Sequence, residues 1–117
     1  MDKKYDLEER TSKFSGNVIR FCKTIKQDVI SKPIISQLVR SGTSVGANYC
    51  EADNASTKKD FTYKISICRK EAKETTYWLQ MIVTAVPSLN DLVSPMSKEA
   101  HELNLIFSAI AKKSSEQ

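Results

Sequence analysis

Hydrophobic residues recur along most of the chain at spacings of three and four, the period of an α-helix with one buried face. The pattern is clearest over residues 58–86, where apolar or small side chains form a bundle seam at Phe61, Ile65, Cys68, Ala72, Thr75, Leu79, Ile82 or Val83, and Val86. Similar amphipathic stretches cover residues 6–30, 33–55 and 95–113. The sequence therefore predicts an all-α fold, an up-down-up-down antiparallel four-helix bundle made of a single domain, residues 1–117.

Prolines and capping residues set the expected limits of these helices. Pro33 separates the first two, because a proline disfavours a helical conformation in the residue before it. Thr57 and Asp60 have the spacing of a capping box, which places the start of the third helix at residue 58. Ser94 followed by Pro95 suits the N-cap and first turn of the last helix.

The second helix carries two glycines four residues apart on its apolar face, Gly42 and Gly46, with Tyr49 one turn further along. A glycine inside a helix costs about 0.8 to 1 kcal/mol relative to alanine. We interpret the two glycines as the site where a neighbouring helix packs closely, because that contact would offset the cost. The alternative is that the glycines are tolerated and have no packing role. The segment also contains Arg40 and Asn48, so it is too polar to span a membrane.

A row of polar residues one helical turn apart lies on the opposite face of the same helix, at Arg40, Ser44, Asn48 and Glu51. The third helix offers Glu71 and Glu74 as partners. We interpret these residues as a buried hydrogen-bond network that fixes the register between helices or subunits, in preference to a catalytic group.

The third helix has a second apolar set nearly opposite its seam, made of Tyr63, Ile67, Trp78, Met81 and Ala85. One bundle core cannot cover both sides of a helix, and large exposed aromatic clusters are unusual. The pattern therefore predicts a homo-oligomer that buries this face, with Glu74 paired or at the wet rim of the interface.

The net charge of +4 and a pI near 9.0 favour an anionic partner. The basic residues that we assign to a phosphate-binding surface are Lys13, Arg20, Lys23 and Lys26 of the first helix and Arg69, Lys70 and Lys73 of the third. The alternative is an ordinary solvated charged surface.

Enzymatic sites find little support in the sequence. A di-iron centre in a bundle needs two Glu-x-x-His elements, and the chain has one histidine, His101. Its three cysteines form no Cys-x-x-Cys pair and are interpreted as core or near-core residues. We therefore expect no catalytic activity, no metal and no cofactor. The chain start lacks the apolar core of a signal peptide, which predicts a cytoplasmic protein without a membrane partner.

The segment Arg40 to Ala52, followed by Asp60-Phe61, Lys64-Ile65, Lys70-Glu71-Ala72, Glu74-Thr75 and Tyr77-Trp78-Leu79, resembles the bacterial 23S rRNA intervening-sequence proteins. The resemblance extends to the accessory variability proteins of diversity-generating retroelements. It implies a homopentameric barrel whose basic surface binds nucleic acid and, in retroelements, a reverse transcriptase. It also implies that the Arg40 to Ala52 segment and Tyr77-Trp78-Leu79 serve fold and assembly.

Together these observations favour a non-enzymatic, oligomeric bundle that binds RNA or DNA through its phosphates, as the partner of an rRNA insertion or of a reverse transcriptase. The competing interpretation is a protein-interaction scaffold without affinity for nucleic acid.

Overall fold

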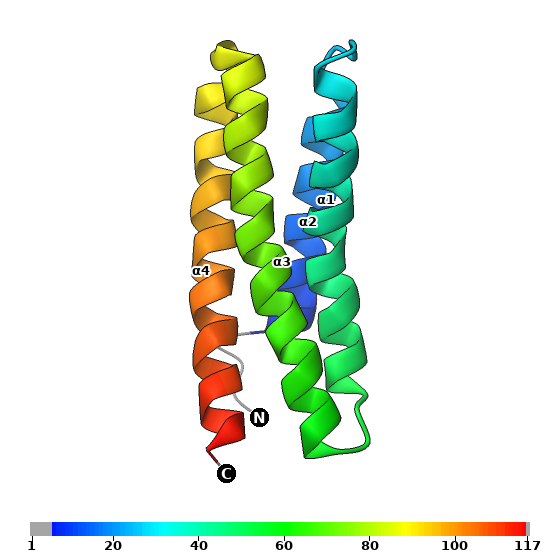
Figure 1. The fold of residues 1–117 in the computed structure, drawn as a ribbon, viewed down its shortest axis with the longest axis vertical. Helices are drawn as coiled ribbons and strands as arrows, with labels where there is room; N and C mark the ends of the chain where they lie inside the picture. Colours follow the sequence, from blue (N-terminus) through cyan, green and yellow to red (C-terminus); the bar gives the residue numbers. More distant parts are fainter. Residues whose placement is uncertain (1–5, 117) are drawn as a thin grey trace.

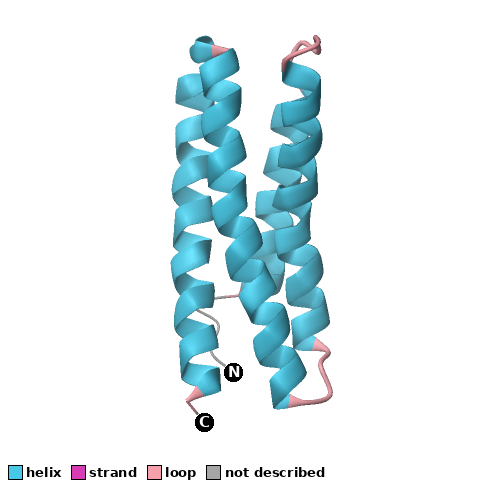
Figure 2. Ribbon diagram, viewed as in Figure 1, coloured by secondary structure: helices cyan, strands magenta, loops and turns pink. Residues whose placement is uncertain are grey.

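The computed structural model describes residues 6–116, which form four α-helices and one short 3-10 helix. The elements are α1 (Leu7–Lys23), α2 (Ser31–Asp53), α3 (Lys58–Ala85), η1 (Pro87–Leu89) and α4 (Asn90–Ser115). Successive helices run antiparallel and form a rod about 47 Å long (Figure 1). The segments between them are short loops (Figure 2). The predicted all-α antiparallel four-helix bundle is confirmed.

The helices pack in chain order around the bundle. α2 lies between α1 and α3, and α3 lies between α2 and α4. α1 approaches α4 along a short stretch, and within residues 6–116 no Cα atom of α1 lies within 8 Å of a Cα atom of α3. α1 and α3 therefore occupy diagonal corners of the bundle, and their outward faces point in different directions (Figure 1).

The core lies along the common axis, and every α-helix contributes to it. The α3 seam is buried at Ile65, Cys68, Ala72, Thr75, Leu79 and Ile82, as its spacing predicts. The largest fully buried side chains of the other helices are Phe14, Val18, Leu38, Val45, Leu103 and Phe107. At the start of α3 the Asp60 amide donates to the Thr57 hydroxyl oxygen at 3.0 Å, as in a capping box.

The boundary between the first two helices differs from the prediction of 6–30 and 33–55. α1 ends at Lys23 because the Thr24 hydroxyl donates to the Phe21 carbonyl at 2.7 Å, which closes the last turn. Asp28 and Ser31 form a reciprocal pair at the entry to α2: the Asp28 carboxylate accepts from the Ser31 amide at 2.7 Å, and the Ser31 hydroxyl accepts from the Asp28 amide at 2.9 Å. This Asp-x-x-Ser pair has the reciprocal bonding of a capping box and leads directly into α2, whose third residue is Pro33.

The last helix also begins earlier than predicted. Pro87 ends α3 and starts η1, which passes directly into α4 at Asn90. Pro95 therefore lies inside α4 and is not a first-turn proline after a Ser94 cap. It removes one helical hydrogen bond. Burial of Val93 and Met96 on the first turns of α4 offsets that cost.

The cysteines differ from the expectation that all of them lie in or near the core, because Cys50 is exposed while Cys22 and Cys68 are buried. Burial raises the pKa of Cys22 to about 11 and that of Cys68 to about 12. Since the thiolate is the reactive form, we expect a disulfide reagent at pH 8 to label one thiol per folded chain rapidly, and all three in denaturant. Cys50→Ser should abolish the rapid phase. Fast labelling of a second thiol would contradict the structure.

Candidate nucleic-acid interface

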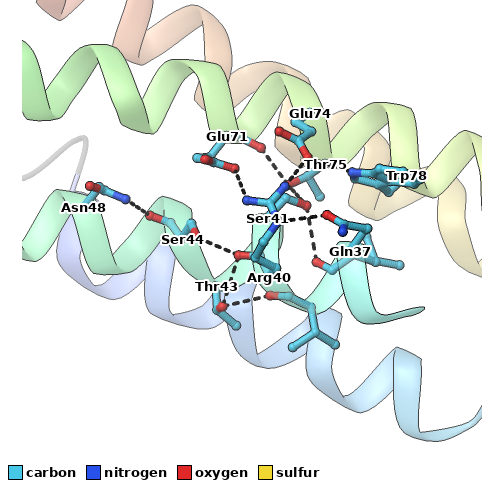
Figure 3. A network of polar contacts seen from close by, with 12 residues as sticks. Gln37, Arg40, Ser41, Thr43, Ser44, Asn48, Glu71, Glu74, Thr75 and Trp78 are labelled. Atoms are coloured by element: carbon cyan, nitrogen blue, oxygen red, sulfur yellow. Dashed lines mark hydrogen bonds and ion pairs between the residues drawn. The ribbon is translucent and has the colours of Figure 1, made fainter. Parts of the chain in front are cut away.

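Arg40 is the centre of a polar network that joins α2 to α3 (Figure 3). Its guanidinium lies 3.2 Å from a Glu71 carboxylate oxygen and also contacts Glu74. It donates through Nε to the Gln37 side-chain oxygen at 2.9 Å. The Trp78 indole N–H donates to Glu74 at 2.9 Å. The Arg40 guanidinium thus holds two carboxylates of α3 against α2, and the Trp78 indole binds one of them from within α3.

The charges in this network are mutually stabilised. The Trp78 N–H and the Arg40 guanidinium hold the pKa of Glu74 below its ordinary value. Desolvation opposes the charged form of Arg40, but the Glu71 and Glu74 carboxylates outweigh it and raise the pKa of Arg40. A carboxylate kept ionised in this way serves structure and is poorly suited to accept a proton in catalysis.

The predicted polar row does not form one buried network. Arg40 is 44% exposed. Ser44 and Asn48 bond to their own helix, with the Ser44 hydroxyl donating to the Arg40 carbonyl and the Asn48 amide to the Ser44 carbonyl. Glu51 is exposed and forms an ion pair with Lys64 of α3 at 2.5 Å. The row therefore divides between bonds within α2 and contacts with α3. Short hydroxyl and amide side chains reach the carbonyl groups of the preceding turn of their own helix more easily than they reach a neighbouring helix.

Beneath Arg40 lies a buried pair of hydroxyls that also crosses from α2 to α3. Thr75 Oγ1 is 3.1 Å from Ser41 Oγ and 2.8 Å from the Glu71 carbonyl oxygen. Both side chains are fully buried. A buried hydrogen bond between α2 and α3 is therefore made by this uncharged pair, while the predicted charged row lies nearer the surface.

The two glycines of α2 face α1, but they are not equivalent. A Cβ atom at Gly42 would lie 3.0 Å from Val18 Cγ1, closer than side chains normally pack. At Gly46 the nearest atoms, of Thr11 and Ser15, would be 3.5 Å away, an ordinary contact. The Ser15 hydroxyl also donates to the Gly42 carbonyl at 2.9 Å. Tyr49, on the same stripe, is half-buried with its ring 6.1 Å from that of Phe107.

Three of the predicted phosphate-binding residues line one hollow of about 490 Å³ between α3 and α4. These are Arg69, Lys70 and Lys73, and within residues 6–116 none of them pairs with a carboxylate. The Asn104 amide of α4 donates to the Arg69 carbonyl at 2.9 Å at this wall. Glu74 also lines the hollow, but Arg40 and Trp78 already engage it.

The other predicted basic residues lie elsewhere. Lys13, Arg20 and Lys23 are exposed on α1, and Lys26 is exposed in the loop that follows it. α1 and α3 lie at diagonal corners of the bundle, and none of these four residues lines the hollow formed by Arg69, Lys70 and Lys73. The Arg20 guanidinium donates to the Asn17 side-chain oxygen at 2.9 Å.

The second apolar face of α3 divides into two parts. Trp78 and Met81 are half-buried, and Trp78 meets the exposed ring of Tyr77 edge-on with centroids 4.9 Å apart. Tyr63 is 61% exposed, and together with Ile67 it lines the basic hollow. The residues predicted to serve assembly and those predicted to bind phosphate thus share the outer surface of α3.

Sequence reasoning missed one strong interhelical contact. Arg10 of α1 donates to Glu99 of α4 through Nε at 2.7 Å and through a terminal nitrogen at 2.8 Å, and it also reaches Glu102. The hydrogen bonds to these two carboxylates outweigh desolvation and raise the pKa of Arg10. This contact ties the thinly packed α1–α4 side together. The two partners are 89 residues apart, so helical spacing could not reveal it.

The described residues lack two further features, a cluster of metal ligands and a membrane-spanning helix. In residues 6–116, no three His, Cys, Asp or Glu side chains gather as they would around a metal ion. His101 is exposed on α4. Over the same range, none of the helices combines the length and apolar character that crossing a bilayer requires.

Comparison with known proteins identifies the family of this bundle. The sequence profile of the 23S rRNA-intervening sequence protein family matches residues 3–109. The chain belongs to this family. A crystal structure of a protein with unknown function from the S23 ribosomal protein family of Bacteroides thetaiotaomicron is similar, with 29% identity and a TM-score of 0.84. That alignment covers 95% of this chain and 99% of the other. No curated protein matches the chain.

The family match spans α1 to most of α4, so it includes the Arg40 network, the two glycines and the basic hollow. The four-helix arrangement is shared with the Bacteroides protein over nearly all of both chains. Family membership therefore concerns the whole bundle rather than one motif within it.

Proposed function

We propose that this protein is a non-enzymatic member of the 23S rRNA-intervening sequence family that binds nucleic acid through its phosphates. The observation that carries the proposal is the hollow lined by Arg69, Lys70 and Lys73, three cations without carboxylate partners in residues 6–116. Unpaired cations gathered in a hollow attract phosphate oxygens, and phosphate contacts supply most of the affinity of non-specific nucleic-acid binding. The acids nearest to them are engaged in the Arg40 network, which favours binding over catalysis.

The family match and the resemblance each indicate one kind of nucleic acid to test as a ligand. The family name points to an insertion in 23S rRNA, which makes RNA the first ligand to test. The resemblance to the retroelement accessory proteins adds a nucleic acid handled by a reverse transcriptase. A scaffold without nucleic-acid affinity is the competing proposal, and salt dependence separates the two.

The test compares two sets of charge removal by fluorescence anisotropy with labelled RNA and DNA between 50 and 200 mM salt. Arg69→Gln, Lys70→Gln and Lys73→Gln together remove three cations from the hollow, and Lys13→Gln, Arg20→Gln and Lys23→Gln remove three from α1. We expect the first set to reduce the slope of log affinity against log salt by about 2 on single strands, at about 0.7 per phosphate contact. The second set should change it little. Equal effects of both sets, or no binding by the parent protein, would refute the proposed site.

We also propose a homo-oligomer, a pentamer by resemblance, that covers Trp78, Met81 and the exposed ring of Tyr77. These residues place apolar surface on the outside of a single bundle, where an interface would bury it. Trp78→Glu should lower the mass measured by light scattering, and Tyr77→Glu should do so without touching the core. Gln80→Glu, which adds the same charge at an exposed neighbouring position of α3, is the control. A monomeric mass for the parent protein would contradict the proposal.

A further inference from the structure

The basic hollow is one part of a longer groove between α3 and α4. A second hollow shares Ser66 and Arg69 with it, and a third, near the start of α3, shares Thr62 and Ser115 with the second. The lining of α3 runs from Lys58 to Lys73, a length of about 22 Å at 1.5 Å per residue. Figure 1 shows the two helices side by side over this whole stretch.

The chemistry of the lining suits a polyanion along the full length of the groove. Its cations are Lys58, Lys59, Arg69, Lys70, Lys73 and Lys112. Its hydroxyl groups are those of Thr62, Ser66, Ser108, Ser114 and Ser115. Thr62 and Ser114 hydrogen-bond to each other between the two helices, and the Ser66 and Ser115 hydroxyls donate to carbonyl groups of their own helices. Glu74 is the one acid among these lining residues, and it lies at one end, held by Arg40. The ammonium and guanidinium groups at successive helical turns are therefore the donors that this groove offers to a sugar-phosphate backbone.

Tyr63 gives the groove a feature that phosphate binding does not require. It lines both the first and the third hollow, so it stands at their junction, and 61% of it is exposed. An aromatic ring beside a cationic track is the arrangement on which unpaired bases stack in single-strand binding proteins. Bases within a duplex are already stacked on one another, so a ring in a groove between two packed helices cannot reach their faces.

Resting on the proposed function, we infer that the α3–α4 groove binds single-stranded nucleic acid, with phosphates along its lysines and one base stacked on Tyr63. At about 3.4 Å per stacked nucleotide, the groove covers on the order of six nucleotides. Lys58, Lys59 and Lys112 extend the site beyond the three cations of the proposed function. The ring of Tyr63 then serves the ligand, in place of the assembly role that its position on α3 suggests from sequence.

The experiment uses a labelled 12-nucleotide single strand and a duplex of the same sequence, measured by anisotropy at 50 mM salt. We expect the single strand to bind at least about tenfold more tightly than the duplex. Tyr63→Ala should weaken single-strand binding by about tenfold, the typical loss for one stacked base. Tyr63→Phe should retain the affinity. Lys58→Gln, Lys59→Gln and Lys112→Gln together should lower the single-strand salt slope by about 2.

The outcomes separate this inference from the proposed function. If duplex and single strand bind equally, and only the Arg69, Lys70 and Lys73 set weakens them, phosphate binding stands and the single-strand groove is wrong. If neither nucleic acid binds, both proposals fail. A reduced mass of Tyr63→Ala in light scattering, at unchanged helix content, would instead make Tyr63 an assembly contact and overturn its stacking role.

Discussion

Gly42→Ala lowers the free energy of unfolding by about 1 to 3 kcal/mol, the usual cost of overpacking a tight contact. The added Cβ would lie 3.0 Å from Val18 Cγ1, and Val18 is fully buried, so it cannot turn away. Gly46→Ala is the matched control four residues further along the same helix. Its Cβ meets ordinary 3.5 Å contacts, and the gain in helix propensity should raise stability by up to about 1 kcal/mol.

Urea unfolding followed by circular dichroism at one fixed protein concentration measures both changes. A double-mutant cycle identifies the cause: in a Val18→Ala background the clash is removed, and the cost of Gly42→Ala should shrink. Equal effects at Gly42 and Gly46 would show that the two helices do not approach more closely at one glycine than at the other.

Phe107→Ala lowers the free energy of unfolding by about 3 to 5 kcal/mol, the range for truncating a buried aromatic residue. Phe107 lies on α4, is 0% exposed, and meets the half-buried Tyr49 ring of α2 across the bundle. Removing its ring leaves a cavity between helices that are not adjacent in the chain. That loss is comparable to the whole stability of a small domain.

Leu105→Ala, two residues away on the same helix, is the control because Leu105 is 54% exposed. Its effect should stay within about 0.5 kcal/mol. The thermal midpoint from calorimetry should therefore fall strongly for Phe107→Ala and hardly at all for Leu105→Ala. A larger loss of stability for Leu105→Ala than for Phe107→Ala would mean that α4 turns Leu105, and not Phe107, toward the core.

Where a signal was local, sequence reasoning came close to the structure. α3 begins at Lys58 after its Thr57 cap and ends at Ala85 before Pro87, within one residue of the expected range. α1 and α4 were placed less well. The expected first helix, 6–30, includes Asp28, although Asp28 and Ser31 have the spacing of a reciprocal pair at a helix start. Ser94-Pro95 has the pattern of a helix start, although α4 already includes it. A proline restricts the backbone of the residues next to it. Whether the helix begins at the proline or several residues before it depends on the packing of those residues against the core.

The candidate site was predictable in its parts and not in its arrangement. Arg69, Lys70 and Lys73 follow from charge on one helix, and they do share one hollow. The α1 residues have the same chemistry and equally exposed positions. Only the packing order of the helices, which sets α1 diagonal to α3, separates the two groups.

The amino-acid sequence by itself determined the helical class, the seam of α3 and the antiparallel bundle, because helical period and capping act between residues a few positions apart. The tertiary structure alone decided which glycine is tight, that Arg10 clamps α4, and that basic residues of α3 meet hydroxyls of α4 in one groove. These features depend on distances between side chains far apart in the chain. Such distances are set by how whole helices pack, which no local pattern encodes.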